Sequence, residues 1–169
     1  MTTIDIFVAL KILHIGALIF WLGPSLGAWF VLLALRKHVG EITPAAHLAY
    51  RIFIYTLILE HVAFVALIAS GIGMACLVYG FNQPWLQWKL LIIMFLIVPL
   101  EILDIWYGNI KLPQIFARLN EAGYDAKQTR TLHIYHAYIT CTAIAVIPIS
   151  ILAIMWLVVA KPNLTLLWH

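Results

Sequence analysis

The sequence carries little charge for its length. Only 10% of its 169 residues are Asp, Glu, Lys or Arg, whereas these residues make up about a quarter of a typical soluble domain. Hydrophobic residues account for 64% of the chain. The composition therefore excludes an ordinary soluble globular domain, and it favours a chain that lies mostly within a lipid bilayer.

Cysteine and recognisable catalytic motifs are also scarce. The two cysteines, Cys76 and Cys141, lie far apart and form no CxxC pair, which is the spacing of many redox and zinc sites. A nucleophile elbow, a phosphate-binding loop and a zinc-protease motif are all absent, which argues against a hydrolase. The net charge of +3 comes without any nucleic-acid-binding motif, so we expect no nucleic-acid partner.

Long apolar segments dominate the sequence. Four of them cover about residues 4–35, 52–79, 86–110 and 134–160, and about 20 apolar residues are enough for one membrane-spanning helix. The first segment follows no basic residues and is too long for the core of a signal peptide, so we expect it to remain as a helix. We predict one transmembrane domain over residues 1–169, an all-α antiparallel four-helix bundle.

The basic residues predict how the bundle is oriented. Seven lie near the two connections on one side of the membrane, and only three belong to the other side (Arg36, Lys37, Arg51, Lys111, Arg118, Lys127 and Arg130, against Lys11, Lys89 and Lys161). Since basic loops tend to stay in the cytoplasm, both termini are expected in the periplasm. Gly23 and Gly27 form a GxxxG pattern, which favours close helix packing within the bundle or a homo-oligomer.

Ionisable residues lie inside the apolar segments, where an unpaired charge costs several kcal/mol. A cytoplasmic layer is expected to combine imidazoles and carboxylates from the second, third and fourth segments (Glu60, His61, Glu101, Asp104, His133 and His136). Glu101 and Asp104 are spaced i,i+3 and should share one helix face. The alternatives are that His133 and His136 are solvated at the membrane interface, that Glu60 is a hydrogen-bonded neutral acid, and that Asp104 pairs with Lys111 or Arg130.

Two chemistries suit this layer. His61 and His136, on different helices, could hold a haem iron from both sides. The same layer could instead bind a divalent metal, with His61, His133, His136, Glu60, Glu101 and Asp104 as candidate ligands. On the periplasmic side, His14 is followed by Trp21 two turns later on the same face, and Lys89 opens the third segment at a comparable depth.

Three short motifs resemble a known group of membrane proteins. Lys11-Ile-Leu-His14 followed by Trp21 resembles the first helix of HemJ-type protoporphyrinogen oxidases, and Pro84-Trp85-Leu86 leading to Lys89-Leu90 resembles their third helix. The segment from Trp156 to Lys161-Pro162 is similar to their C-terminal signature. It is more similar still to that of a related bacterial four-helix family of unknown function, and the CopD copper-resistance membrane domain belongs to the same broad group.

The resemblance implies a haem b-binding protein of the bacterial inner membrane. His14 matches the first-helix histidine of the family, and Lys89 matches a third-helix lysine. The third-helix histidine that follows a tyrosine in HemJ proteins is absent here, where the chain reads Ile105-Trp106-Tyr107-Gly108. His61, His133 and His136 have no counterpart that can be carried over from the family.

These observations leave three functions open. The first is a haem b protein that transfers electrons to or from quinone or a porphyrinogen. The candidate cofactor-binding residues are then His14, His61, His136 and Trp21. The candidate catalytic residues are Glu101, Asp104 and Lys89. The second is binding or transport of a divalent metal or copper, with His14 and the cytoplasmic layer as ligands; the four methionines form no cluster of the kind that Cu(I) favours. The third is a membrane subunit or assembly factor without a cofactor, whose polar residues bond between helices.

Overall fold

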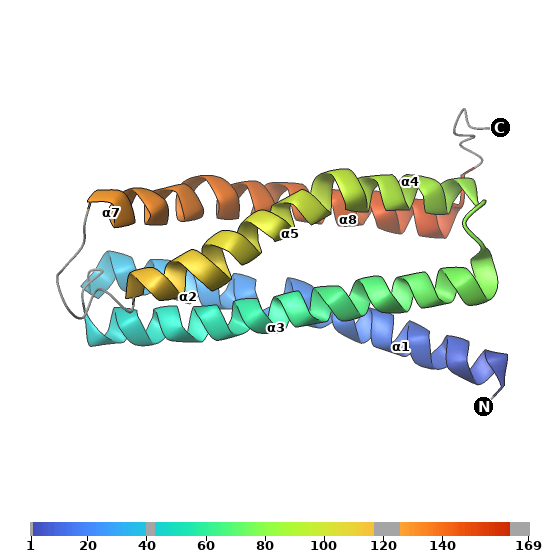
Figure 1. The fold of residues 1–169 in the computed structure, drawn as a ribbon, viewed down its shortest axis with the longest axis horizontal. Helices are drawn as coiled ribbons and strands as arrows, with labels where there is room; N and C mark the ends of the chain where they lie inside the picture. The colour runs from blue at the N-terminus through green and yellow to red at the C-terminus, as the bar shows by residue number, and fades with distance from the viewer. Residues whose placement is uncertain (1, 40–42, 117–125, 163–169) are drawn as a thin grey trace.

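The computed structural model describes residues 2–39, 43–116 and 126–162, and these residues are helical almost throughout. The helices lie side by side along the long axis of the molecule (Figure 1). The elements are α1 (Thr3–Leu22), α2 (Pro24–Val39), α3 (Pro44–Met74), η1 (Ala75–Tyr79), α4 (Pro84–Ile92), η2 (Ile93–Ile97), α5 (Val98–Asp104), η3 (Ile105–Lys111), α7 (Ala126–His133), η4 (Ile134–Ile139) and α8 (Thr140–Ala160).

These elements join into four rods that are long and apolar enough to cross a membrane. Within the described residues, the rods cover Thr3–His38, Ala45–Tyr79, Pro84–Phe116 and Lys127–Ala160. Large apolar side chains lie exposed along all four rods, for example Ile19, Phe95, Ile102 and Val159, as expected where lipid is the solvent. The protein is thus a multi-pass integral membrane protein with four helical spans, as the sequence predicts.

The rods extend beyond the apolar segments of the sequence. The second begins at Ala45 rather than near residue 52, because the Thr43 hydroxyl caps the helix and Pro44 occupies its first turn. The third runs on to Phe116 and the fourth starts at Lys127. The additional turns are more polar, so hydropathy alone does not detect them.

The first rod is broken in the middle. α1 ends at Leu22, Gly23 caps it, and Pro24 opens α2, because proline is favoured in the first turn of a helix and disfavoured further inside one. Other irregularities are π-helical: η2 precedes Pro99, and η3 and η4 contain Asn109, Tyr135 and His136. Such π segments are often found at functional sites.

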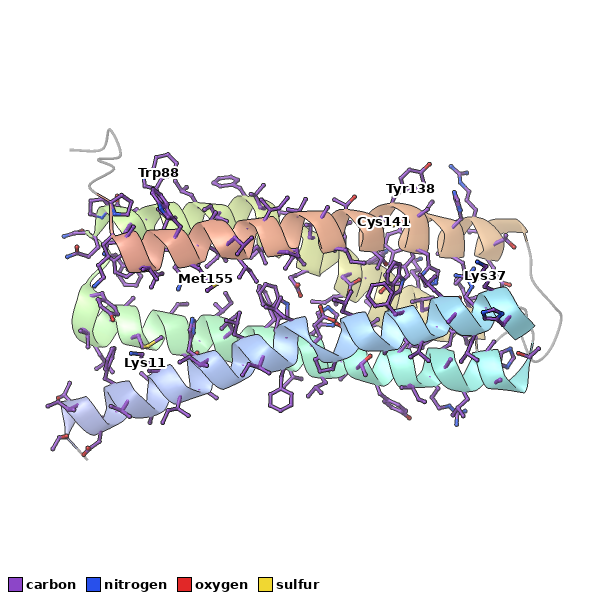
Figure 2. The ribbon with its side chains drawn as sticks, turned by 180° about the vertical axis from the view of Figure 1, so that it is seen from behind. Lys11, Lys37, Trp88, Tyr138, Cys141 and Met155 are labelled. Carbon is purple, nitrogen blue, oxygen red and sulfur yellow. The ribbon has the colours of Figure 1, made fainter. Side chains whose placement is uncertain are left out.

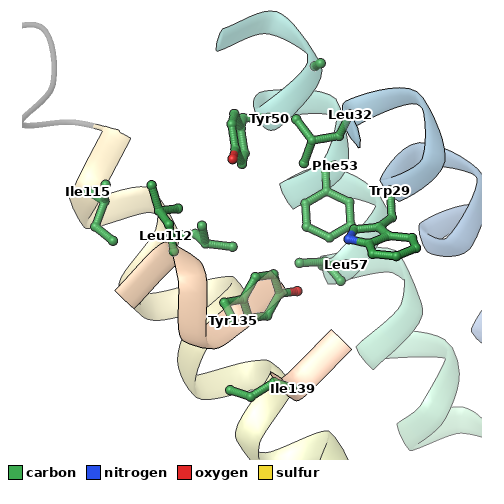
Figure 3. Packing of buried hydrophobic residues seen from close by; sticks show 11 residues of the cluster. Trp29, Leu32, Tyr50, Phe53, Leu57, Leu112, Ile115, Tyr135 and Ile139 are labelled. Atoms are coloured by element: carbon green, nitrogen blue, oxygen red, sulfur yellow. The ribbon is translucent and has the colours of Figure 1, made fainter. Parts of the chain in front are cut away.

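Three buried clusters follow one another along the bundle. The largest joins α2, α3, residues 112–116, α7 and η4 around Trp29, Tyr50, Phe53 and Tyr135 (Figure 3). The second surrounds Trp21, with Ala17, Ala63, Leu67 and Ile97. The third joins Trp85 and Leu86 to Ala75. At this last end α1 packs on α3 and α4 packs on α8, and a large cavity lies between these two pairs.

Candidate functional site

Two carboxyl groups of the third rod approach the same histidine. Oε2 of Glu101 lies 3.7 Å from Nε2 of His61, and Oδ2 of Asp104 lies 3.3 Å from the same nitrogen. Glu101 is 3% exposed and His61 is 7% exposed. The structure therefore brings together His61, Glu101 and Asp104, which the sequence placed in one layer.

Hydrogen bonds from aromatic residues hold this cluster in place. The indole nitrogen of Trp21 donates to Oε1 of Glu101 at 2.9 Å. The hydroxyl of Tyr135 donates to Oδ1 of Asp104, also at 2.9 Å. Asp104 thus bonds to Tyr135 and faces His61, rather than Lys111 or Arg130. We refer to His61, Glu101, Asp104 and Glu60 below as the acid cluster.

Asn109 fixes the orientation of the His61 ring. Its side-chain nitrogen lies 2.9 Å from Nδ1 of His61. Because an amide nitrogen can only donate, Nδ1 accepts this bond and Nε2 carries the proton. The Nε2–H group therefore faces the two carboxyl groups, although neither contact has the geometry of a hydrogen bond and Nε2 has no hydrogen-bond partner.

A small cavity of about 110 Å³ borders the acid cluster, and Glu60, Glu101, Asp104 and Tyr135 line it. Oε2 of Glu60 and Oε2 of Glu101 are buried and accept no hydrogen bond from the protein. The other Glu60 interaction is a hydrogen bond with Ser25 of α2. Buried polar atoms without partners are rare, because each costs about 1–3 kcal/mol.

His136 occupies a separate position from the acid cluster. The indole nitrogen of Trp29 donates to its Nδ1 at 3.4 Å, and its Nε2 lies 3.3 Å from the hydroxyl of Tyr50. An accepting Nδ1 requires that Nε2 carry the proton, so the ring is neutral and both nitrogens are engaged. His133, one turn earlier, is exposed and stacks edge-on against Tyr138. These two histidines border a third cavity of about 480 Å³, together with Trp29 and Arg36.

His14 lines the large cavity between α1, α3, α4 and α8. The cavity has a volume of about 550 Å³, and α1, α3, η1, α4, η2 and α8 contribute to its wall. The lining is almost wholly apolar and includes Met155, which is labelled in Figure 2. His14 and Trp21 both line it, as expected for residues that share one helix face, and Lys89 lines it from α4.

The His14 ring has a defined protonation state. Its Nδ1 lies 3.0 Å from the backbone carbonyl of Leu67 and 3.1 Å from the Ser70 hydroxyl. A carbonyl oxygen can only accept, so Nδ1 carries a proton, and in the neutral ring Nε2 keeps its lone pair for a ligand. Gly71 makes room for the ring, since a Cβ at this position would lie 3.1 Å from Cε1 of His14.

No three described His, Cys, Asp or Glu side chains are arranged to hold a metal ion. The sequence-based candidates for a metal site lie instead in three places: His14 at the large cavity, His61 with Glu60, Glu101 and Asp104 at the small one, and His133 with His136 at the third.

Several residues of the site are not apparent from the sequence. Trp29, Tyr50, Asn109 and Tyr135 all bond to an ionisable side chain, yet aromatic and amide residues near membrane interfaces are ordinary. Ser70 has the small side chain that is typical of helix packing, so the sequence does not indicate its contact with His14. Only Tyr135 has a signal in the sequence: it is adjacent to His136, so both residues lie on the same helical turn.

The fold and its buried polar groups define a four-span integral membrane protein. The chain belongs to the family described as "Predicted integral membrane protein (DUF2269)", which matches residues 8–162. No curated protein and no solved structure matches the chain.

Proposed function

We propose that the protein is a redox protein of the bacterial inner membrane that binds haem b in the large cavity, with Nε2 of His14 as a ligand to the iron. The observation that carries the proposal is the hydrogen bond from Nδ1 of His14 to the Leu67 carbonyl. Metal-binding histidines commonly donate their second ring nitrogen to such an acceptor, which fixes the tautomer and raises ligand basicity.

The cavity suits an apolar cofactor that bears acidic groups. Its volume of about 550 Å³ lies within the range of roughly 300–1,000 Å³ that is usual for ligand sites. Lys89 is the cation among the described lining residues, and no carboxylate accompanies it there. Its ammonium group is suited to pair with a haem propionate, while the apolar wall excludes water.

Haem b bound in this way supplies one-electron transfer at a potential set by its ligand and by burial. The chain itself binds the group, orients it through His14 and keeps the site dry. In this proposal both termini lie in the periplasm, and the resemblance to HemJ-type proteins makes quinone or a porphyrinogen the expected redox partner.

His61 and His136, as a pair of haem ligands, are the alternative to His14. This arrangement would require His136 to give up its bonds with Trp29 and Tyr50. His14 requires no such change, and for this reason we prefer it.

The test is the visible absorption spectrum of the detergent-purified protein, oxidised and then reduced with dithionite. We expect a Soret band and sharp α and β bands on reduction. His14→Ala should abolish or shift these bands, and His133→Ala, which removes an exposed imidazole, is the matched control. If the haem bands persist in His14→Ala but are lost in His61→Ala or His136→Ala, the haem ligands are the other histidines and not His14. A colourless protein from cells with ample haem would contradict the proposal altogether.

A further inference from the structure

The three cavities form a series along the bundle. Trp21 lines both the large cavity and the small one, and Trp29 lines both the small cavity and the third one. Each tryptophan also bonds to an ionisable residue, Trp21 to Glu101 and Trp29 to His136. Each pair of neighbouring cavities therefore shares a tryptophan that is itself hydrogen-bonded to an ionisable residue.

The middle cavity has the properties of a site for water and protons. Oε2 of Glu60 and Oε2 of Glu101 are buried and lack hydrogen-bond partners, and both residues line this cavity. Its volume of about 110 Å³ is enough for a few water molecules, each of which needs at least two polar partners. Water or a proton bound by the carboxyl groups would satisfy both atoms.

The third cavity shares Trp29 with the middle cavity and lies toward the polar end of the bundle. It is bordered by Arg36, Thr129 and the exposed His133, close to the ends of α2 and α7. Tyr135 lies between the two regions: its hydroxyl bonds to Asp104, and its ring centroid is 5.1 Å from that of His136. Polar groups thus continue from the end of the bundle to Glu101.

We propose that Glu101, together with Glu60, Asp104 and His61, is a proton-binding site that exchanges protons with the aqueous phase through the third cavity. With haem bound in the large cavity, its reduction by one electron from a quinol would be accompanied by uptake of one proton from the aqueous phase at this site. No covalent bond other than the O–H or N–H bond of that proton forms. The coupling to the electron rests on the proposed function, whereas the proton-binding site does not.

The groups that face Glu101 come from every neighbouring helix. α3 contributes Glu60 and His61, α5 contributes Asp104, and η4 contributes Tyr135. α1 and α2 contribute Trp21 and Ser25, which are uncharged, and among the lining residues α8 adds Thr140 and apolar side chains.

The first experiment uses infrared spectroscopy on the purified protein, without any need for a cofactor. We expect a carboxylic acid C=O band that disappears as the pH is raised and that is absent or halved in Glu101→Gln. Asp5→Asn, which removes an exposed carboxyl at the start of α1, should leave the band unchanged. A wild-type protein without a titrating band would overturn the proposal, and so would a band of full size in Glu101→Gln.

The second experiment tests the route of exchange. Ala137 lines the third cavity, and Ala137→Leu should fill part of it without altering the acid cluster. We expect the carboxyl band to shift in D₂O several-fold more slowly in this variant than in wild type. An unchanged rate would exclude the third cavity as the route.

The third experiment addresses the coupling. In the haem-loaded protein the midpoint potential should fall as the pH rises, and this dependence should be lost in Glu101→Gln and kept in Asp5→Asn. A potential that is independent of pH in wild type would refute the coupling. If the protein binds no haem, the proposed function fails, and the infrared result still decides whether the proton-binding site exists.

Discussion

The indole nitrogen of Trp21 lies 2.9 Å from Oε1 of Glu101, a residue 80 positions later in the chain. Trp21 lies 18 residues after Thr3 and 17 before His38, and Glu101 lies 17 after Pro84 and 15 before Phe116. The bond therefore joins the midpoints of the first and third rods. Because Trp21 also lines the large cavity, it connects the residues around His14 with the acid cluster.

Replacing Trp21 should destabilise the bundle. Trp21→Phe keeps most of the apolar ring but leaves both Glu101 oxygens without a hydrogen bond, and we expect a loss of about 1–2 kcal/mol. The melting temperature in detergent should fall accordingly. Trp156→Phe, at a position that is 56% exposed, is the control and should have little effect. Equal melting temperatures for the two variants would show that the bond contributes nothing.

Replacing Lys89 should weaken cofactor binding. Lys89→Gln removes the cation of the large cavity, and we expect haem affinity to fall by about tenfold or more, equivalent to roughly 1.4 kcal/mol. The absorption bands of whatever haem remains bound should keep their positions, since His14 is unchanged. Titration of the apoprotein with haemin measures this, with Lys11→Gln, at an exposed position on α1, as the control. Wild-type affinity in Lys89→Gln would mean that Lys89 does not pair with a propionate.

Adding a methyl group at Gly71 should displace His14. A Cβ there would lie 3.1 Å from Cε1 and 3.5 Å from Nδ1 of the ring, so the ring must move relative to the Leu67 carbonyl. We expect Gly71→Ala to lower haem binding or to shift the Soret band. Gly16→Ala, where a Cβ would meet no heavy atom within 4 Å, should retain the wild-type spectrum. Identical spectra in both variants would argue that haem is not bound at His14.

Gly108 provides a separate test of the packing around Tyr135. A Cβ at this position would lie 2.8 Å from Cδ1 of Leu57 and 3.1 Å from the Tyr135 hydroxyl. Both side chains are almost fully buried, so we expect Gly108→Ala to cost about 1–3 kcal/mol. Gly27→Ala adds the same methyl group in open space and should be neutral or slightly stabilising. A melting temperature of Gly108→Ala that equals or exceeds that of Gly27→Ala would contradict this packing.

The fold was largely predictable, because four apolar segments of sufficient length permit few arrangements. His14 and Trp21 were also expected on one face, and the structure places both at the large cavity. These inferences depend only on helical periodicity and on hydropathy, which a single sequence displays directly.

The sequence does not predict how the polar residues separate into distinct groups within the bundle. The depth of a residue in the membrane depends on where its helix begins and ends, and the helices extend up to seven residues beyond the apolar segments, as at Ala45 and Lys127. The assumed cytoplasmic layer consequently separates into the acid cluster and the surroundings of His136. The π-helical turns of η3 and η4 also rotate the side chains that follow. The spacing of residues in the sequence does not predict such a turn.

The break between Gly23 and Pro24 makes lipid composition relevant to the large cavity. A span whose length differs from the thickness of the bilayer adjusts by tilting, and a rod interrupted at its middle can tilt in halves. α1 carries His14 and forms one side of that cavity, while α2 packs separately with α3 around Trp29. A thinner membrane would therefore tilt α1 with little effect on α2, and the distance from His14 to the opposite wall would vary with the acyl chains around the protein.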